Sequence, residues 1–440
     1  MFSFFEFFAG GGMVRAGLGG DWRCLFANDF DPKKAQSYIA NWGDKELHVG
    51  DVATIALHDL PKQTPNLIWG SFPCQDLSLA GAGKGLEGAR SGSFWPYWRL
   101  VEQLVREGRA PGVIVLENVA GTLTSHEGKD FEAIIRAFAD IDFDVGAMLV
   151  DAQHFVPQSR PRLFFVGVPR AQAPRQLSLL NEEVDRWHPA NVKRAYLALP
   201  AALQKRWIWW SMPAPPTRNA CFVDVIEEEP TGVKWHTKAE TKRLLSMMSP
   251  VNVEKVEAAK QTGRRMAGGM YRRTRTENGK SVQRVEVRFD DVSGCLRTPA
   301  GGSSRQFLLI VEGDTVRSRL ISARETARLM GLPDSYKLPE NYNDAYHLTG
   351  DGVVVNVVKY LAENIIEPQI AVVTANSKKK AAKKKSAAAK AKGKKASAKK
   401  SAKKGASKPR KAKKANAAKK PKTGTRTNAP KSVRGRRKAA

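Results

Sequence analysis

The chain has 440 residues, and 42% of them are hydrophobic, which is enough for two or three globular domains with substantial cores. Its formal net charge of +30 lies almost entirely at one end: residues 377–440 hold 28 lysines and arginines and no acidic residue, whereas the first 376 residues carry 45 basic and 43 acidic residues. The four cysteines are widely spaced and form no C-x-x-C pair, which argues against a disulfide framework or a zinc site and fits a reducing compartment. No run approaches about 18 apolar residues, so no membrane-spanning helix is expected.

Short apolar runs alternate with amphipathic stretches through the first 170 residues. FSFFEFF, CLFAND, NLIWGSF, GVIVLENV, GAMLVD and RLFFVGV are typical of strands, and helical patterns such as YWRLVEQLVREG lie between them. This alternation predicts an α/β fold with a doubly wound, mostly parallel sheet. The last two strands are too close for a crossover helix, so an antiparallel hairpin is expected at the sheet edge. The apolar start of the chain lacks a basic flank and is expected to be the first strand, not a signal peptide.

A glycine-rich segment, FFAGGGMVRAGL, follows the first predicted strand and opens a helix. Backbone N–H groups at such a turn can face a polar or anionic ligand. The spacing does not match the G-x-G-x-x-G dinucleotide motif, because the glycine after Gly10 and Gly12 is Gly17, and Lys84 lacks the Ser or Thr that follows it in a Walker loop. Alone, the segment is also compatible with a plain tight turn.

Acidic and aromatic residues at the next two strand ends favour a nucleotide site. Asp29 ends the second predicted strand, where a carboxylate can accept hydrogen bonds from both ribose hydroxyls, and Phe30 beside it can cover an adenine ring. Asp51 follows the third strand and is placed to accept from an adenine amino group. Each feature alone is ordinary for a surface, but together they predict an adenosine site in the crevice of an open sheet.

Cys74 lies in GSFPCQDLS, after the fourth predicted strand and therefore at the same crevice. A free cysteine is usually a small buried hydrophobic residue, but Pro73 restrains the backbone before it and a polar, glycine-rich sequence follows. Loop N–H groups or a nearby cation would stabilise the thiolate and make it a nucleophile. The next strand, GVIVLENV, runs into Glu117, which is either a helix cap or a buried acid able to donate to an unprotonated ring nitrogen.

Two arginines follow in FVPQSRPRLFFVG. The strand period of two puts Gln158, Arg160 and Arg162 on one face and Ser159 and Pro161 on the other. Pro161 also indicates an edge strand or the start of a strand. Arginines at an edge are usually solvated, but facing the crevice these two would bind a carbonyl oxygen or a phosphate.

With these residues in view, the sequence closely resembles the DNA (cytosine-5)-methyltransferase family, of the compact prokaryotic or phage type. The resemblance follows the family's motif order over about residues 4–366, and FPCQ, ENV and Q-x-R-x-R are highly specific as a set. It implies a Rossmann-like catalytic domain that uses S-adenosyl-L-methionine as methyl donor. It also implies that Cys74 is the nucleophile, that Glu117 addresses the target base, and that Arg160 and Arg162 orient the base and the cysteine loop. The matching segments are FAGGGMVRAGL, NDFDP, GDV, GSFPCQDLS, ENV, QSRPR, RETARLMGLPDSY and GDGVVVNVV.

The resemblance further implies a set of cofactor-binding residues, of which Asp29, Phe30 and Asp51 would hold the adenosine end. In the family's last motif an asparagine usually follows the glycine, whereas GDGV places Asp351 there. An aspartate cannot donate as an asparagine does, which leaves open how the methionine end is held. The full set is Phe8, Ala9, Gly10, Gly12, Asp29, Phe30, Asp51, Val52, Pro73 and Asp351.

The implied chemistry explains these residue types. Carbon 5 of cytosine is a poor nucleophile, so a thiolate first adds to carbon 6, and Glu117 and Arg162 stabilise the charge that develops on the ring nitrogen and the exocyclic oxygen. Methyl transfer, loss of the carbon 5 proton and release of the thiol follow. Because a base inside a stacked duplex is out of reach, the cytosine is expected to flip into the crevice.

The composition predicts four regions along the chain. Within the second, the basic glycine loops RMAGGMYRRTR and TPAGGSSRQ are expected to approach DNA. The expected regions are a catalytic domain (1–170), a smaller loop-rich target-recognition domain (171–340), a C-terminal helix returning to the catalytic domain (341–376) and a disordered tail rich in lysine and alanine (377–440).

Two further features are expected towards the end of the chain. A helix should begin with Ser322 as N-cap and Glu325 in the capping-box position and stop at residues 331–333. The tail resembles the ends of linker histones in composition, and its charges are expected to bind phosphates without sequence preference.

Two other functions stay open on the sequence: an RNA cytosine-5 methyltransferase, and a catalytically inactive nucleoid DNA-binding protein. Methyltransferases acting on amino groups and zinc deaminases are disfavoured, because the sequence lacks their signatures. The expected partner is double-stranded DNA, and no metal or membrane is expected. A cognate restriction endonuclease is a further candidate partner. The protein is expected to be monomeric, cytoplasmic and nucleoid-associated.

Overall fold

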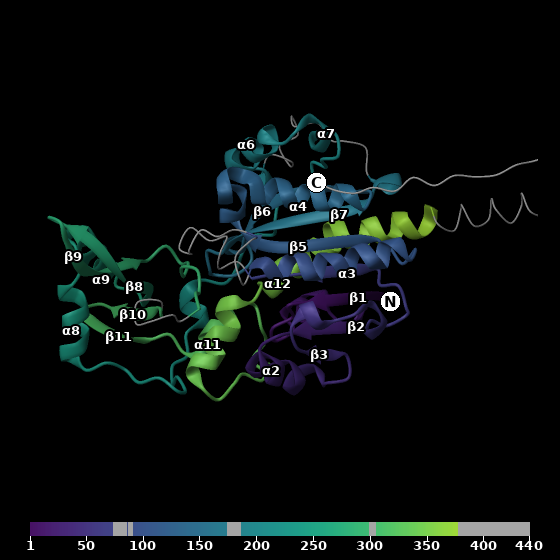
Figure 1. Ribbon diagram of the computed structural model, residues 1–440. Coiled ribbons are helices and arrows are strands. Elements are labelled where there is room, and N and C mark those ends of the chain that lie inside the picture. The colour runs from purple at the N-terminus through teal and green to yellow at the C-terminus, as the bar shows by residue number, and fades with distance from the viewer. Residues whose placement is uncertain (74–85, 87–90, 174–185, 299–304, 377–440) are drawn as a thin grey trace, which may run out of the picture. The chain divides into compact units, whose positions relative to one another are not determined.

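The computed structural model describes residues 1–73, 86, 91–173, 186–298 and 305–376. Two sheets organise them (Figure 1): one has seven strands and the other has four. Both sheets belong to one compact unit, Met1–Lys378. Within the described ranges, no helix is long and apolar enough to cross a bilayer.

The larger sheet has the strand order β3-β2-β1-β4-β5-β7-β6. Strands β1 to β5 pair in parallel, and β7 runs antiparallel to both of its neighbours. The predicted doubly wound, mostly parallel sheet and its terminal hairpin are therefore confirmed. β7 is an interior strand, and it tolerates Pro161 because proline stands at its first position. The strands are β1 (Phe2–Phe7), β2 (Trp22–Asp29), β3 (Leu47–Val49), β4 (Leu67–Gly70), β5 (Val113–Val119), β6 (Phe143–Asp151) and β7 (Pro161–Pro169).

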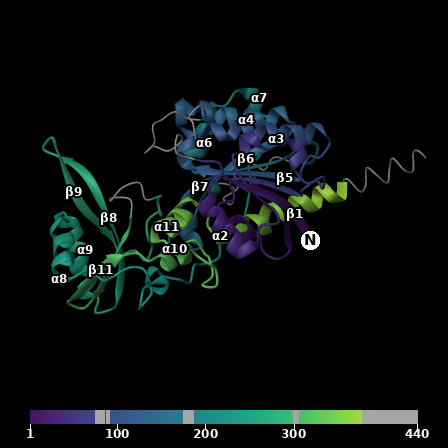
Figure 2. The same cartoon turned by 60° about the horizontal axis from the view of Figure 1, so that its bottom comes forward.

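Different helices cover the two faces of this sheet, because side chains alternate along the strands. One face packs against α3 (Phe94–Arg106) and α4 (Lys129–Asp140), and the other against α1 (Met13–Leu18), α2 (Pro32–Trp42) and α12 (Val355–Leu361). Figure 2 shows α3 and α4 together on one side of the strands and α2 on the other. Since α12 comes late in the sequence, the chain returns to the first sheet after forming the second.

The segment from residue 187 to 210 also packs against the first sheet. It contains α6 (Ala190–Ala198) and α7 (Ala201–Gln204), and Trp207 bridges to Val145 on β6. Gly146 permits this approach, because a Cβ there would lie 1.8 Å from the carbonyl oxygen of Ile208. The packing therefore places this segment with the first sheet, beyond the boundary expected at residue 170.

The second sheet is antiparallel, with the order β11-β10-β8-β9, and it shares a hydrophobic core with α8 (Lys238–Ser246) and α9 (Pro250–Gln261). The stretch RMAGGMYRRTR, expected to be a loop, is in fact part of strand β8, so the expectation of a loop was wrong. Its glycines suit a covered strand, because a Cβ on Gly268 would lie 2.7 Å from the Phe289 ring. Most of the second expected loop lies outside the described residues. The strands are β8 (Met266–Glu277), β9 (Lys280–Arg288), β10 (Phe307–Glu312) and β11 (Thr315–Leu320).

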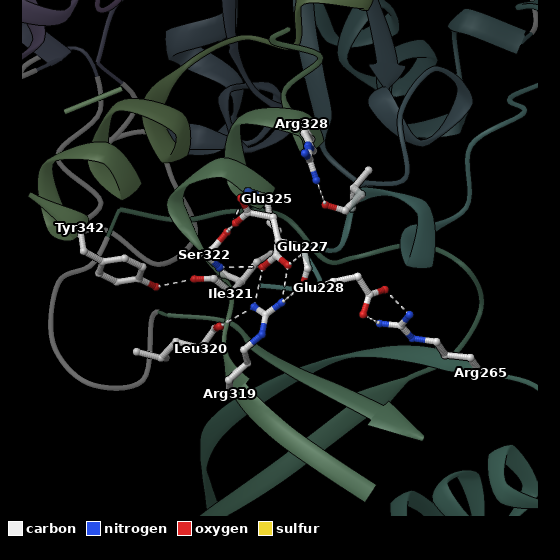
Figure 3. Close-up of polar contacts among 11 residues, drawn as sticks. Glu227, Glu228, Arg265, Arg319, Leu320, Ile321, Ser322, Glu325, Arg328 and Tyr342 are labelled. Atoms are coloured by element: carbon white, nitrogen blue, oxygen red, sulfur yellow. Dashed lines mark hydrogen bonds and ion pairs between the residues drawn. The ribbon is translucent and has the colours of Figure 1, made fainter. Parts of the chain in front are cut away.

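A buried ion pair joins the end of the second sheet to the helix that follows it, α10 (Ala323–Leu329) (Figure 3). Arg319 on β11 donates to both carboxylate oxygens of Glu325 at 2.7 and 2.5 Å, and both side chains are 0% exposed. Glu325 also accepts from the backbone N–H groups of Ser322 and Glu227. The predicted capping box of Ser322 and Glu325 is confirmed, and the same carboxylate neutralises a buried guanidinium.

Glu325→Gln is expected to lower the free energy of unfolding by about 3 kcal/mol or more, because it leaves the buried Arg319 charge without a counterion. Urea denaturation measures the change. Asp334→Asn is the matched control: it breaks the exposed 2.8 Å pair with Arg328 and should cost less than about 1 kcal/mol. Equal small losses in both variants would contradict this account.

Glu6 is the last but one residue of β1, and its carboxyl accepts hydrogen bonds from the backbone of Val14 and Arg15 in α1. Burial raises the pKa of its carboxyl to about 8, although the Arg15 charge and the backbone N–H groups of Val14 and Arg15 lower it in part. Its Oε2 atom has no hydrogen-bond partner among the described residues. The folded protein therefore holds this carboxyl protonated where an unfolded chain would ionise it.

Wild-type stability is expected to fall as the pH rises from about 5 to about 8, because folded Glu6 keeps its proton and unfolded Glu6 releases it. Glu6→Gln cannot titrate and should show a shallower fall in the free energy of unfolding over this range. Urea denaturation along the pH series compares it with Glu107→Gln, an exposed control. If both variants keep the wild-type slope, Glu6 is not the titrating group.

Candidate active site

The glycine-rich turn between β1 and α1 has an unusual backbone. Gly10 and Gly12 have φ values of 55° and 77°, and Phe8 has a φ of 61°, which a bulky residue rarely adopts. The Ala9 N–H donates to the carbonyl of Asn28 at 2.9 Å and so ties the turn to the end of β2. The surrounding structure therefore holds this turn in a conformation that it would not adopt alone.

The two sides of this turn differ. On one side the carbonyl oxygen of Gly11 accepts from the Tyr336 hydroxyl at 2.7 Å and from Trp42 Nε1 at 3.0 Å, and a Cβ on Gly11 would lie 2.3 Å from that hydroxyl. On the other side, a Cβ on Gly10 would meet no atom within 4 Å among the described residues. The turn is closed by packing on one side and open for a ligand on the other.

Asp29 ends β2 and braces the open side of the turn. Its Oδ2 accepts from the Gly10 N–H at 2.7 Å and its Oδ1 from the Asp31 N–H at 2.8 Å. Burial raises the pKa of this carboxyl, and the nearby Lys34 charge opposes the rise. Each carboxylate oxygen can accept a second hydrogen bond, so a hydroxyl partner still fits. The next residue, Phe30, is 72% exposed, as a platform for a planar ring would be.

Asp51 and Val52 follow β3 at the same edge of the sheet. The exposed Asp51 side chain caps a short 3₁₀ turn, Val52–Thr54, by accepting from the Ala53 N–H at 2.9 Å. The Val52 side chain is buried in the hydrophobic core and supports the turn from below. Asn28 donates to backbone carbonyls on either side of Val49 and holds this strand end against β2.

The segment that leads to Cys74 is held against the end of β5. Asn118 Nδ2 donates to the carbonyl of Phe72 at 3.1 Å, and Gly70 pairs with Leu116 across the strands. Cys74 itself lies outside the described residues, and Pro73 is the last described residue before it. Asn118, which immediately follows Glu117, therefore places the backbone two residues before Cys74 beside that acid.

Glu117 and Arg162 come together where β5 and β7 lie side by side. Arg162 Nε lies 3.1 Å from Glu117 Oε1, and their side chains are largely buried. Arg162 also donates to the carbonyl of Pro161 at 2.9 Å. Strand register explains the contact, because Arg162 pairs with Val119 and Glu117 stands two residues back on the same face. Together they form an acid and a fixed cation at the mouth of the crevice.

Arg160 does not share the surroundings of Arg162. It is 2% exposed and donates to the carbonyls of Leu296, Gly350 and Gly352 at 3.0, 2.8 and 2.7 Å. The period of two does not apply here, because β7 begins only at Pro161. Arg160 thus holds distant segments of the chain together, and its guanidinium is enclosed by backbone.

A cavity of about 500 Å³ opens beside Pro161, and basic side chains from the second sheet line it. Cys295 is also on its wall, 3.4 Å from Arg160 Nη1. Burial opposes ionisation of this thiol, but Arg160, Arg162 and Arg297 outweigh it and lower its pKa. The lining includes Ser159, Lys255, Tyr271, Arg273, Arg275, Glu286, Arg288, Cys295 and Arg297.

Asp351 is the last residue of α11 (Tyr342–Asp351). It forms an ion pair with Lys34 on α2 at 2.6 Å and accepts from Thr298 Oγ1 at 2.5 Å. The sequence did not identify Lys34 or Cys295 as candidate site residues, because neither lies in a recognisable motif. Tyr336 and Asn118 lie within the quoted motifs PDSY and ENV, so attention to each motif residue would have found them.

Comparison with known proteins agrees with this geometry. A family model described as C-5 cytosine-specific DNA methylase matches residues 2–367. The Type II methyltransferase M.HhaI of Haemophilus parahaemolyticus is 25% identical over 366 residues, which cover 82% of this chain and 93% of that protein. The Type II methyltransferase M.HpaII of Haemophilus parainfluenzae is 24% identical over 390 residues, covering 83% and 89%.

A solved structure supports the fold. The S. pombe Dnmt2 methyltransferase matches with a TM-score of 0.51 and 18% identity, over 84% of this chain and 99% of that one. The family match covers both sheets and the return of the chain through α12. The chain belongs to the C-5 cytosine-specific DNA methylase family, and it is a DNA (cytosine-5)-methyltransferase.

Proposed function

We propose that the crevice at the carboxyl ends of β1 to β5 binds S-adenosyl-L-methionine, and that Cys74, Glu117 and Arg162 act on a cytosine flipped out of duplex DNA. The observation that carries this proposal is the 3.1 Å contact between Arg162 and Glu117. It lies next to the segment that Asn118 holds just before Cys74. An acid, a cation and the approach to a thiol thus converge on neighbouring strand ends.

The residues of the crevice fit the proposed cofactor. Gly10 leaves open space among the described residues, the Asp29 carboxylate can accept from ribose hydroxyls, and Phe30 is exposed where an adenine ring would need a cover. When bound, S-adenosyl-L-methionine supplies the methyl group. The chain's own residues then bind and orient the two substrates.

The proposed roles at the base follow from its chemistry. The Cys74 sulfur forms a bond to carbon 6, which moves electron density to carbon 5 and to the ring nitrogen and exocyclic oxygen. Glu117 donates a proton to that nitrogen, and Arg162 stabilises the oxygen while fixing the orientation of Glu117. Once carbon 5 carries the methyl group, its proton passes to water in the crevice, and the carbon–sulfur bond breaks with the Cys74 thiolate as leaving group. The ring nitrogen then returns its proton to Glu117. Arg160 is proposed to act as a positioning residue through the backbone that it holds.

The second sheet is proposed to carry target recognition. Its cavity beside Pro161 has Lys255, Arg273, Arg288 and Arg297 on the wall, and these cations suit a phosphate backbone. The basic residues of 377–440 lie outside the described residues, and we propose that they add binding to phosphates without sequence preference and favour association with the nucleoid. We also propose a monomer as the active form, with a cognate restriction endonuclease as a genetic partner, as the Type II names of its relatives suggest.

Wild-type protein is expected to form a stable covalent adduct with duplex DNA that contains 5-fluorocytosine in the target site. Fluorine at carbon 5 replaces the proton that must leave, so the bond from Cys74 to carbon 6 cannot be released. Denaturing electrophoresis after incubation with S-adenosyl-L-methionine measures the adduct. Cys74→Ser should abolish it, and Cys221→Ser should retain it.

The same assay separates the rival functions when a 5-fluorocytosine transfer RNA is added as a second substrate. An adduct with the RNA and none with the duplex would favour an RNA methyltransferase. No adduct with either nucleic acid would favour an inactive DNA-binding protein.

Deletion of residues 377–440 is expected to weaken DNA binding and make its salt dependence less steep, because fewer counterions are released from the phosphates. Single-turnover methylation at saturating DNA should survive. Titrations across salt concentrations measure the first effect and quench-flow the second. A tail of the same length with glutamine in place of its basic residues should behave like the deletion. Loss of the methylation step in either variant would contradict the tethering role.

A further inference from the structure

Asp351 lies close to the glycine-rich turn of the proposed cofactor crevice, because a Cβ on the next residue, Gly352, would lie 2.2 Å from Met13 at the start of α1. The family resemblance implies that the cofactor's methionine end lies here, and Asp351 has no hydrogen to donate to it. Burial opposes its ionisation, but the Lys34 charge and the hydrogen bonds from Lys34 and Thr298 lower its pKa, so it is a carboxylate at neutral pH. One oxygen accepts from Lys34 at 2.6 Å and the other from Thr298 at 2.5 Å. A carboxylate alone at this place would repel the carboxylate of a methionine group.

Lys34 supplies a positive charge beside Asp351 that can offset this repulsion. It lies in the first turn of α2, directly after the Asp29–Phe30 strand end, and its side chain is 20% exposed. Burial lowers the pKa of its ammonium, but the charges of Asp351 and Asp29 outweigh burial, so the net effect is a raised pKa. Its ammonium therefore stays charged, and it is held 2.6 Å from Asp351.

This ammonium keeps donor capacity. It has three N–H groups, and among the described residues its hydrogen bond goes to Asp351 alone. Arg160, another cation close to this part of α11, is enclosed by the carbonyls of Gly350 and Gly352. The neighbouring Lys33 differs, because it is 65% exposed and pairs with Asp344 at 2.9 Å. Lys34 is thus the cation placed to receive an anion here.

We propose that Lys34 binds the carboxylate of the cofactor's methionine group, and that Asp351 orients the Lys34 ammonium for this contact. The proposal rests on the proposed function, namely that the crevice holds S-adenosyl-L-methionine. The proposal accounts for a residue at position 351 that can only accept hydrogen bonds. The hydrogen-bond donor to the cofactor would be Lys34 on α2 instead of a side chain at the end of α11, and Asp351 would hold the Lys34 ammonium in place.

Two ligands that differ only in the carboxylate test this proposal: S-adenosyl-L-methionine and its decarboxylated form, which keeps the amine and the sulfonium. Isothermal titration calorimetry without DNA measures both dissociation constants. Wild-type protein is expected to bind the first about tenfold or more tightly, as a hydrogen bond between charged groups predicts. Lys34→Met keeps the aliphatic stem and should bind the two ligands alike.

Three controls make the result specific. Lys33→Ala should keep the wild-type preference, since Lys33 pairs with Asp344 outside the proposed contact. The double variant Lys34→Met with Asp351→Asn should recover the preference, because the asparagine amide donates where the ammonium did. Thermal unfolding of each variant checks that it is folded.

The outcomes separate this proposal from the one on which it rests. If Lys34→Met keeps the wild-type preference, or loses affinity for both ligands equally, Lys34 does not hold the carboxylate. If wild-type protein binds both ligands equally well, the inference fails and the proposed cofactor stands. If wild-type protein binds neither ligand, the proposed cofactor itself is wrong.

Discussion

The buried guanidinium of Arg160 is the constraint on which the rest of the site depends. It lies just before β7 and donates to the carbonyls of Leu296, Gly350 and Gly352, which belong to much later parts of the chain. A buried guanidinium without these partners would carry a large desolvation cost, so the three segments must be in place together. Its neighbours in sequence and space include Arg162, Cys295 and Asp351. One side chain thus ties the start of β7 to the cavity wall and to the end of α11.

The crevice and the cavity differ in charge, and so do their proposed ligands. Asp29 and Asp51 follow neighbouring strands at the proposed crevice, and Asp351 is paired with Lys34 on the helix after Asp29. These acids suit a ligand with a sulfonium and an ammonium group. Arginines line the cavity, which suits phosphates. Lys34 is a cation among these acids, and the carboxylate of the proposed ligand would be its partner.

Sequence reasoning succeeded where local patterns decide structure. Alternating apolar runs and helical stretches predicted the parallel sheet, and Ser322 with Glu325 predicted a helix start that the structure confirms. It was wrong for β8, because a glycine-rich basic stretch has no strand signal of its own. Pairing with β9 and β10 and the cover of Phe289 over Gly268 make it a strand. The expectation that Arg160 and Arg162 share a face likewise depended on where β7 begins.

The amino-acid sequence by itself determined where along the chain the strands occur and which candidate site residues follow them, because periodicity and motif spacing are local properties. It therefore identified Glu117, Asp29 and Phe30 as candidate site residues and indicated the family. Only the tertiary structure decided which of the charged residues meet: Arg162 with Glu117, Arg160 with backbone carbonyls, and Lys34 with Asp351. These contacts join residues far apart in the chain, and their energies depend on burial and distance, which no sequence pattern encodes.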